Sequence, residues 1–392
     1  MLVVHVTTAP MALMFLKGQV AFMKERGVEV AAVSSPGHEL DEFGREQGIA
    51  VFSVPMARRV TPLDDLHALL QLRRLLRQLR PTVVHAHTPK GGLLGTLAGV
   101  LAGVPVRVYH MRGLPFMTAT GRRRSLLRWT EKVSCFAAHH VLCVSRSLRE
   151  VALDARLCPS DKIEVLGSGS GNGVDAVKRF NPDLVGGHQR RATRARHGIP
   201  EEAVVVGFVG RVVRDKGIVE LLDAFARLSL RHPDVHLLVV GGLEERDPIP
   251  PAAVKTLSEG ARVHWIGFDW DAPPLYAAMD VVALPSYREG FPNVPLEAAA
   301  MGLPVVATEI PGCVDAVQAG ITGLLVPPAD VDALTAALER YVSDPELRRS
   351  HGNAGRERVR ATFQQEVLWE ALHTRYRELA GRSKAAENGS GE

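Results

Sequence analysis

The sequence predicts an α/β protein built from two doubly wound parallel-sheet domains that face a central cleft. Two series of short β-branched runs alternate with helical stretches, and the series restarts near residue 200. Strands that are apolar along their whole length are typical of parallel sheets covered by helices on both faces. The length of 392 residues agrees, because it exceeds what one ordinary hydrophobic core accommodates.

The first domain is predicted over residues 1–177 and opens on a strand. Leu66, Leu69 and Leu76 recur at helical spacing and Pro81 follows, so a helix is expected to end before that proline. Strand and helix therefore alternate, as in a Rossmann-like sheet. The strands are expected at residues 2–6, 28–33, 50–54, 82–86, 104–109, 140–144 and 163–166.

The second Rossmann-like domain is predicted over residues 178–361. A C-terminal helix over 362–381 is expected to pack back on the first domain, and the small, polar residues 382–392 are expected to be disordered. Ligands of such folds bind at the carboxyl ends of the strands, so we expect the chemistry there. The strands are expected at residues 203–209, 235–240, 262–266, 280–284, 305–307 and 323–326.

Composition and cysteine spacing are typical of an intracellular globular protein. Hydrophobic residues make up 46% of the chain and charged residues 23%, which excludes a largely disordered chain. The four cysteines form no Cys-x-x-Cys pair, so neither a disulfide framework nor a zinc site is indicated. The first residues are expected to form a strand rather than a signal peptide, and the longest uncharged stretch, residues 91–106, is too short to span a bilayer. We expect a cytoplasmic protein.

The two halves of the chain differ in charge. Residues 1–175 carry 22 Lys and Arg against 14 Asp and Glu, a balance of +8, and the rest carry 25 against 29, a balance of −4. A basic first half favours an anionic partner. Nucleic acid is disfavoured, because no basic-aromatic interleaving is present. The arginine-rich stretch 122–129 predicts either a helix in reversible contact with the inner face of the cell membrane or a helix that packs Leu126, Leu127 and Trp129 inward.

Residues 167–173 form a glycine-rich segment, Gly-Ser-Gly-Ser-Gly-Asn-Gly. The dinucleotide fingerprint needs a helix directly after its glycines, and Pro182 arrives too soon for one. We expect a hinge between the domains, with contact to substrate left open.

Two cations lie in the turn after the first strand of the second domain. Arg211 and Lys216 precede a helix whose apolar residues, Val219, Leu222 and Phe225, have helical spacing. A helix N-terminus with two cations predicts an anion site suited to a pyrophosphate. The alternative is a solvated turn.

Two glutamates eight residues apart follow the strand predicted at 280–284. The segment Glu-Gly-Phe-Pro-Asn-Val-Pro-Leu-Glu runs from Glu289 to Glu297, and its two prolines forbid one continuous helix. Glu289 is therefore expected in the loop and Glu297 near the start of the next helix. A carboxylate is a natural acceptor for vicinal sugar hydroxyls, whereas helix-dipole stabilisation is the alternative role for Glu297.

Taken in order along nearly the whole chain, these segments resemble the family 4 retaining glycosyltransferases of GT-B fold. The resemblance rests on the Arg211 and Lys216 turn, the Glu-x7-Glu segment, residues 172–175 with Phe180, and residues 312–317. Residues 87–92 (His-Thr-Pro-Lys-Gly-Gly) and 111–116 (Met-Arg-Gly-Leu-Pro-Phe) look like the branch that builds capsule, O-antigen and exopolysaccharide.

The resemblance implies a role for each matching residue. Arg211 and Lys216 would grip the pyrophosphate, Glu289 the donor sugar and Glu297 the ribose. The implied donor-binding set is Gly210, Arg211, Lys216, Gly241, Ile266, Gly290, Phe291, Pro292, Asn293, Val294 and Glu297.

The acceptor side departs from the family pattern in two places. The glycine pair that the family carries after its first strand is missing, and Arg112 occupies the place of a family histidine. His110 lies two residues earlier on the same strand face, so either His110 or Arg112 is a candidate for that role. The implied acceptor-binding set is Lys17, Gly18, His87, Lys90 and Arg112, and the implied catalytic set is Glu289, Arg211, Lys216, His110 and Arg112.

Neither a metal nor a cofactor is expected. His85 and His87 alternate onto one face of a strand, but the sequence offers them no third ligand. The Asp-x-Asp pairs that begin at Asp269 and Asp330 precede helices and are expected to cap them.

The leading hypothesis is a retaining, metal-independent hexosyltransferase. It would move a sugar from a nucleotide-diphosphate donor, with UDP expected, to a lipid-linked or saccharide acceptor in surface polysaccharide synthesis. Two alternatives stay open: a nucleotide-sugar 2-epimerase of the same fold, and a non-catalytic partner that binds sugar nucleotides.

Overall fold

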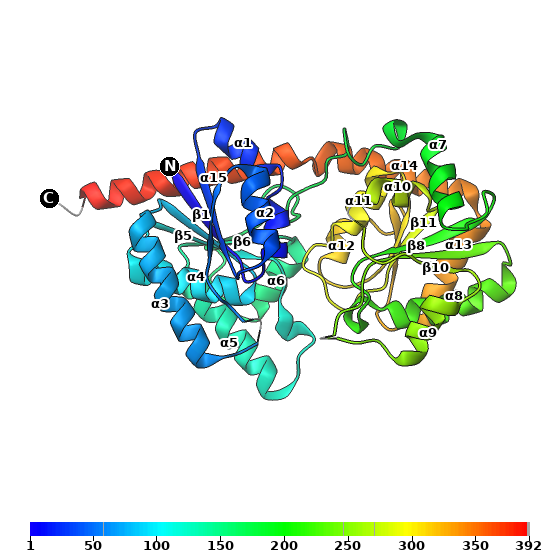
Figure 1. Cartoon of the computed structure of the whole chain (residues 1–392), viewed down its shortest axis with the longest axis horizontal. Helices are drawn as coiled ribbons and strands as arrows, with labels where there is room; N and C mark the ends of the chain where they lie inside the picture. The colour runs from blue at the N-terminus through cyan, green and yellow to red at the C-terminus, as the bar shows by residue number, and fades with distance from the viewer. Residues whose placement is uncertain (58, 246, 270, 390–392) are drawn as a thin grey trace. The chain divides into compact units, whose positions relative to one another are not determined.

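The computed structural model describes residues 1–57, 59–245, 247–269 and 271–389, with side chains up to residue 383. The chain forms two compact units (Figure 1). The first unit consists of residues 1–172 and the segment that begins at Gln365, and the second consists of residues 173–364.

These boundaries differ by a few residues from those expected at 177 and 361. The Asn172 amide donates to the Lys17 carbonyl and accepts from the Trp369 indole, so Asn172 belongs to the first unit. The backbone N–H of Val174 donates to the Phe363 carbonyl, so both ends of the second unit are joined by their own hydrogen bond.

The first unit is built on a seven-stranded parallel sheet with the order β3-β2-β1-β4-β5-β6-β7. Its strands are β1 (Leu2–Val6), β2 (Glu29–Ser34), β3 (Ala50–Ser53), β4 (Val83–His87), β5 (Val106–Met111), β6 (His140–Cys143) and β7 (Ile163–Glu164). Both β4 and β5 run further than predicted, so His87 and His110 lie within strands. The expected strand at 163–166 is shorter.

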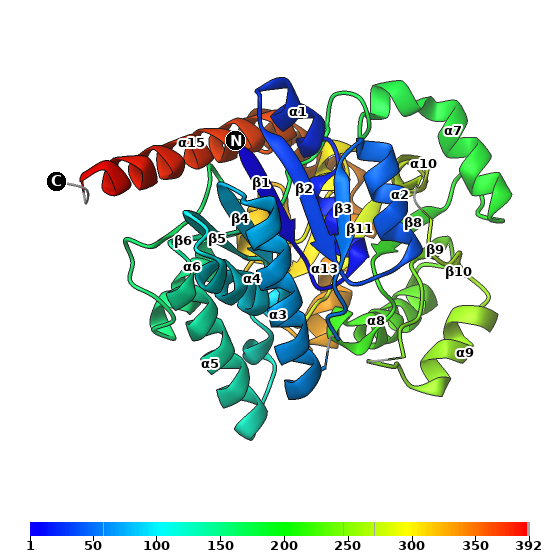
Figure 2. The same ribbon diagram turned by 60° about the vertical axis from the view of Figure 1, so that its left-hand side comes forward.

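Helices cover both faces of this sheet, because alternate strand residues face opposite sides. Val3 belongs to a core with η1, α1, α2 and α15, whereas Val4 belongs to a core with α3 and α4. Figure 2 shows α3, α4 and α5 side by side on one face. The helices are η1 (Pro10–Leu16), α1 (Gln19–Glu25), α2 (His38–Gln47), α3 (Pro62–Leu79), α4 (Pro89–Ala102), η2 (Pro115–Met117), α5 (Gly121–Ala137), α6 (Arg146–Asp154) and α15 (Gln365–Gly389).

The C-terminal helix α15 belongs to the first unit. Its residues Trp369, Leu372 and Tyr376 are buried in the core that contains Val3. The helix continues through Gly389, in keeping with the helix-forming Lys, Ala and Glu residues of this stretch, and the disorder expected for residues 382–392 stays a prediction. Residues 390–392 lie outside the described residues.

The second unit has a six-stranded parallel sheet with the order β10-β9-β8-β11-β12-β13. Its strands are β8 (Val204–Val209), β9 (Val235–Val240), β10 (Val263–Trp265), β11 (Val281–Leu284), β12 (Val305–Thr308) and β13 (Gly323–Val326). Its helices are α7 (Pro182–Arg196), η3 (Arg214–Lys216), α8 (Ile218–Arg231), α9 (Pro251–Glu259), α10 (Ala272–Ala277), α11 (Val294–Ala300), α12 (Cys313–Ala316), α13 (Val331–Ser343) and α14 (Pro345–Thr362).

The strand order reverses direction between β8 and β11, which is the topological switch point where ligands of open α/β sheets bind. Among the helices of the part of the chain that the structure describes, none combines the length and apolar character needed to cross a bilayer.

Candidate functional site

An ion pair between Lys216 and Glu289 lies at the switch point of the second unit. Lys216 ends the short helix η3 after β8, and Glu289 lies in the loop after β11. Both side chains are mostly buried. The Ser286 hydroxyl donates to the same carboxylate over 2.8 Å, so Glu289 Oε1 accepts from two groups. The two residues that the sequence assigned to anion and sugar binding are thus brought together.

Two glycines allow the loops around this ion pair to approach closely. Gly217 has a φ of +68°, and a Cβ there would lie 2.0 Å from the Pro285 carbonyl oxygen. Gly312 has a φ of +85°, and a Cβ there would lie 2.4 Å from the Gly290 carbonyl oxygen. A side chain at either position is excluded by both conformation and space, so the Glu289 loop is held from both sides.

Further hydrogen bonds join the same two loops. The N–H of Tyr287 donates to the Asp215 carbonyl over 2.9 Å, and Arg288 pairs with the Asp215 carboxylate at 2.8 Å. The Tyr287 hydroxyl donates to Glu220 on α8. Because these contacts flank Lys216 and Glu289, the ion pair lies on a preorganised support rather than on free loops.

Arg211 forms a separate ion pair. Its guanidinium is half exposed and pairs with Glu244 at 2.8 Å. Gly210 and Gly241 lie beside it at the ends of β8 and β9, close enough that a Cβ on Gly241 would lie 1.7 Å from the Gly210 oxygen. Ile266 directly follows β10, so the implied donor set comes from the carboxyl ends of four strands.

The second glutamate, Glu297, to which the family resemblance assigns the ribose, lies in the first turn of α11, three positions after its first residue, Val294. The Tyr276 hydroxyl donates to its carboxylate over 2.8 Å. Burial raises the pKa of Glu297, while the hydrogen bond from Tyr276 opposes this rise. Gly290, Phe291, Pro292 and Asn293 form the loop between the two glutamates.

The sequence reasoning missed three polar partners at this site. Ser286 follows β11 and Thr308 ends β12, where the Thr308 hydroxyl donates to the Ser286 carbonyl. Tyr276, on α10, lies far from Glu297 in sequence. A polar residue at the end of a buried strand was the available signal for the first two.

Four buried histidines gather at the carboxyl ends of the central strands in the first unit. His5 on β1, His85 and His87 on β4, and His110 on β5 stack with ring centroids 4.1–5.4 Å apart. His5 supplies the third histidine that the sequence pattern lacked: ligand atoms of His5, His85 and His87 lie within 4.8 Å of one another.

The hydrogen bonds assign protons within this cluster. The Arg112 Nε–H, which can only donate, lies 3.2 Å from His87 Nδ1, so a neutral His87 carries its proton on Nε2. That N–H then donates to His5 Nδ1 over 2.9 Å. Burial lowers the pKa of all four histidines, so the rings are neutral at physiological pH. A cation bound here would have to displace the hydrogen bond between His87 and His5 and lie near the charged Arg112.

Arg112 itself is clamped in place. Besides His87, its Nη1 donates to the Gly171 carbonyl over 3.1 Å, and its guanidinium lies over the Phe15 ring. Burial lowers the pKa of Arg112 to about 10, which leaves it protonated at neutral pH. Within the described residues its Nη2 has no hydrogen-bond partner, so this nitrogen is available to an anion.

The remaining residues of the implied acceptor set have different environments. Lys90, in the first turn of α4, donates to Asp65 over 2.6 Å and also to the Arg59 carbonyl, so its ammonium is already engaged. Lys17 is half exposed and lies 3.5 Å from Glu46. Gly18 has a φ of +80°, and a Cβ there would meet the Trp369 ring at 2.6 Å.

Two sequence predictions about helices have clear outcomes. On α5, Leu126 is 44% and Trp129 is 62% exposed, so the prediction that they pack inward is wrong. Asp330 caps α13 as predicted, because its carboxylate accepts from the Ala333 N–H over 2.8 Å. Asp269 does not cap α10; it accepts from the Asp271 N–H instead.

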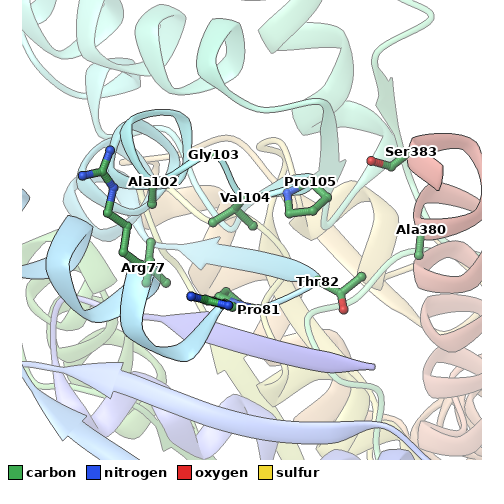
Figure 3. Close-up of a pocket in the computed structure, with 11 residues that line it drawn as sticks. Arg77, Pro81, Thr82, Ala102, Gly103, Val104, Pro105, Ala380 and Ser383 are labelled. Carbon is green, nitrogen blue, oxygen red and sulfur yellow. The ribbon is translucent and has the colours of Figure 1, made fainter. Parts of the chain in front are cut away.

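A pocket of about 590 Å³ in the first unit lies away from these residues. Figure 3 shows Arg77, Thr82 and Pro105 lining it together with Ala380 and Ser383 of α15. Thr82 and Pro105 directly precede β4 and β5, so this pocket lies at the amino ends of the strands. Because ligands of α/β sheets bind at the carboxyl ends, we assign it no part in the site.

Two family models match the two units of the chain. Residues 15–169 match the glycosyl transferase 4-like domain, and residues 189–358 match the glycosyl transferases group 1. The capsular polysaccharide biosynthesis glycosyltransferase CapM of Staphylococcus aureus is 33% identical over 372 residues, which cover 95% of this chain and 96% of CapM. An Escherichia coli enzyme, UDP-Gal:alpha-D-GlcNAc-diphosphoundecaprenol alpha-1,3-galactosyltransferase, is 27% identical over 77% of each chain.

Solved structures give the same fold. The Anabaena protein HepE, in complex with UDP and glucose, superposes with a TM-score of 0.80 at 20% identity over 96% of this chain and 100% of that one. With two Rossmann-like parallel-sheet units, and with CapM similar over nearly its full length, the chain belongs to the family 4 glycosyltransferases of GT-B fold.

Proposed function

We propose that this glycosyltransferase moves a hexosyl group from a UDP-sugar to a lipid-linked or saccharide acceptor in surface polysaccharide synthesis, with retention and without a metal ion. The observation that carries the proposal is the Lys216–Glu289 ion pair at the switch point of the second sheet. The name of the E. coli relative specifies a UDP-Gal donor and a diphosphoundecaprenol acceptor, and the HepE structure contains UDP. Both support the donor and acceptor classes.

Lys216 and Arg211 would replace a metal ion at the pyrophosphate. As the bond to the sugar breaks, negative charge grows on the departing diphosphate, and two preorganised cations stabilise that charge. Without donor, each cation is paired with a carboxylate, Lys216 with Glu289 and Arg211 with Glu244. Donor phosphates would replace the two carboxylates as partners of these cations. The site would then exchange one anion for another and would bury no additional charge.

Glu289 and Glu297 would bind different parts of the donor. Glu289, once its lysine turns to the phosphate, presents a carboxylate to the sugar hydroxyls and to the positive charge that develops on the ring. Glu297 sits at the start of α11 with Tyr276 on one oxygen, which leaves the other to accept from the ribose hydroxyls. The roles of Gly290 to Val294 would be backbone contacts to sugar and phosphate.

On the acceptor side, Arg112 is the strongest candidate. Its free Nη2, its protonated state and its clamp by His87 and Gly171 suit a fixed contact to an acceptor phosphate. His110 is buried and neutral and lacks a partner on Nδ1 among the described residues, so it would bring no charge to the acceptor. Lys17, Gly18 and His87 would shape this side, and Lys90 would act only after leaving Asp65.

Membrane contact through the first unit is part of the proposal. Leu126, Trp129 and Phe136, the last 85% exposed, lie on α5 together with Arg122, Arg123 and Arg124. Exposed apolar side chains among cations suit an anionic membrane surface, at which a polyprenyl-linked acceptor would be found. The acceptor would then be collected from the inner face of the cell membrane.

A donor screen tests the proposal. Purified protein is incubated with UDP-, GDP- and ADP-linked sugars, with and without lipid extract, and released nucleotide is measured. We expect acceptor-dependent release from a UDP-sugar that persists in EDTA, with an α-linked product from an α-linked donor. Release that needs a divalent ion, or an inverted product, contradicts the mechanism. Epimerase and pure binding functions are not retained, because the relatives above are transferases.

A further inference from the structure

Two cysteines that lie 23 positions apart in sequence line one cavity of the first unit. Cys135 lies on α5 and is fully buried, and Cys158 lies in the segment after α6 and is half buried. The cavity measures about 460 Å³, and Lys132, Phe136 and Lys162 line it as well. No spacing motif in the sequence indicates this pair, because α6 separates the two cysteines along the chain.

The segment that carries Cys158 is fastened to α5 and α6 on both sides of the cysteine. Before it, Arg128 of α5 donates through Nε and Nη2 to the Ala155 carbonyl, at 3.1 and 2.7 Å. After it, Lys162 donates to the carbonyl of Phe136, the residue next to Cys135, over 3.1 Å. Arg149 of α6 donates to the Ile163 carbonyl over 3.0 Å. These bonds fasten the segment that carries Cys158 against α5, the helix that carries Cys135.

The two thiols have opposite electrostatic surroundings. The hydrogen bond that Cys135 donates lowers the pKa of Cys158, and Lys162 and Arg149 lower it further. That same hydrogen bond, together with burial, raises the pKa of Cys135, as does the carboxyl of Glu131, one helical turn earlier. These surroundings favour the thiolate form at Cys158 over that at Cys135.

We infer that Cys158 and Cys135 form a reversible redox pair, with Cys158 as the attacking thiolate and Cys135 as the resolving thiol. The oxidant is a hydroperoxide. The Cys158 sulfur attacks one peroxide oxygen, the O–O bond breaks, and the leaving alkoxide or hydroxide takes a proton from water, which leaves Cys158 as a sulfenic acid. The peroxide gains the two electrons.

In the second step the Cys135 sulfur attacks the sulfenic sulfur. The S–S bond forms, the S–OH bond breaks, and the departing hydroxide takes the Cys135 proton and leaves as water. An external dithiol reverses the reaction by thiol–disulfide exchange. Because Cys158 is the partly exposed member and Cys135 is buried, Cys158 meets both the oxidant and the reductant.

Thiol mapping of the full chain tests this inference. The protein is treated with hydrogen peroxide, remaining thiols are alkylated, and peptides are examined by mass spectrometry before and after reduction. We expect one cross-linked peptide pair that joins Cys135 to Cys158 and disappears with dithiothreitol. Cys143 and Cys313 should remain alkylatable throughout.

Single substitutions separate the two roles. Cys158→Ser should slow thiol oxidation at least about tenfold, because the three remaining thiols are buried away from the oxidant. Cys135→Ser should leave a sulfenic acid on Cys158 that dimedone traps, because the resolving thiol is gone. Cys313→Ser is the matched control and should behave as wild type. Circular dichroism verifies the fold of each variant. A cross-link through Cys143 or Cys313, equal oxidation rates at all four cysteines, or no cross-link in folded wild type overturns the inference.

Discussion

Lys216 and Glu289 form an ion pair across the loops that follow β8 and β11, although 73 positions separate them in sequence. The closest approach of these loops depends on Gly217, whose Cβ would clash with Pro285. In this pair, Lys216 offers a cation that can bind an anion, and Glu289 offers a carboxylate that can accept hydrogen bonds from hydroxyl groups.

Removing the Lys216 cation should impair turnover. Lys216→Met is expected to lower kcat about a hundredfold, near 2.7 kcal/mol, because one preorganised stabiliser of the departing diphosphate is lost. Nucleotide release is measured under saturating donor, with Lys255→Met on the exposed face of α9 as control. A rate close to wild type in the folded variant would contradict the role of Lys216 at the diphosphate.

The two glutamates should separate in binding and turnover. Glu297→Gln is expected to weaken UDP binding about tenfold, because a charged hydrogen bond to the ribose is lost. Glu289→Gln is expected to spare UDP affinity and lower kcat about a hundredfold, since its contacts strengthen as charge develops on the sugar. Calorimetry with UDP and steady-state kinetics distinguish the two, and Glu259→Gln is the control. The opposite split would reverse the assignment.

A buried carboxyl in the first unit should make stability fall as pH rises. The Tyr109 hydroxyl donates to Glu131 over 2.6 Å, and burial raises the pKa of Glu131 to about 7. A carboxyl whose pKa is raised on folding stabilises the protein at low pH, and this contribution is lost between about pH 4.5 and about pH 7. The ionised form at higher pH costs about 3 kcal/mol.

Glu131→Gln keeps an oxygen for Tyr109 and removes the ionisation. We expect the free energy of unfolding of the variant to equal that of wild type at about pH 5 and to exceed it at about pH 8. Taking the difference between the two proteins at each pH cancels the buried histidines, which both contain. A difference that does not change with pH would show that Glu131 stays ionised, or stays protonated, throughout.

The cations of α5 should control membrane binding. Arg122, Arg123 and Arg124 changed together to Gln should weaken binding to anionic vesicles about a hundredfold at low salt, since each contributes about 1 kcal/mol. Arg128 is left in place, because it holds the Ala155 carbonyl.

The matched control changes three exposed arginines of the second unit, Arg340, Arg349 and Arg360, to Gln. Co-sedimentation is measured across a salt series, and binding of wild type should fall with salt because the attraction is screened. Equal binding by both triple variants would mean that α5 does not meet the membrane and that its arginines only solvate the helix.

Much of the architecture was predictable from local patterns. The runs at 2–6 and 235–240 coincide with β1 and β9, and the leucine spacing of residues 66–76 lies within α3, because periodicity reports which face of an element is buried. Proline placement also put Glu289 in a loop and Glu297 in a first helical turn, as the structure has them.

Pairing between distant elements could not be read in the same way. Glu244 beside Arg211, and Cys158 beside Cys135, depend on strand order and on how connecting segments fold back. His5 joins His87 because β1 pairs with β4 in this sheet, a neighbour relation that no local spacing encodes.

The exposure of the side chains on α5 was likewise not determined by the local sequence pattern. The sequence of α5 was compatible with Leu126 and Trp129 on either side, since an amphipathic pattern rich in arginine fits a membrane face and a packed face equally well. Packing decided it: Ser134 and Cys135 are buried, which turns Trp129 outward. Local residue patterns specify helices, strands and their turn chemistry, whereas the neighbours of a side chain are set by tertiary packing, because contacts far apart in sequence depend on the whole chain at once.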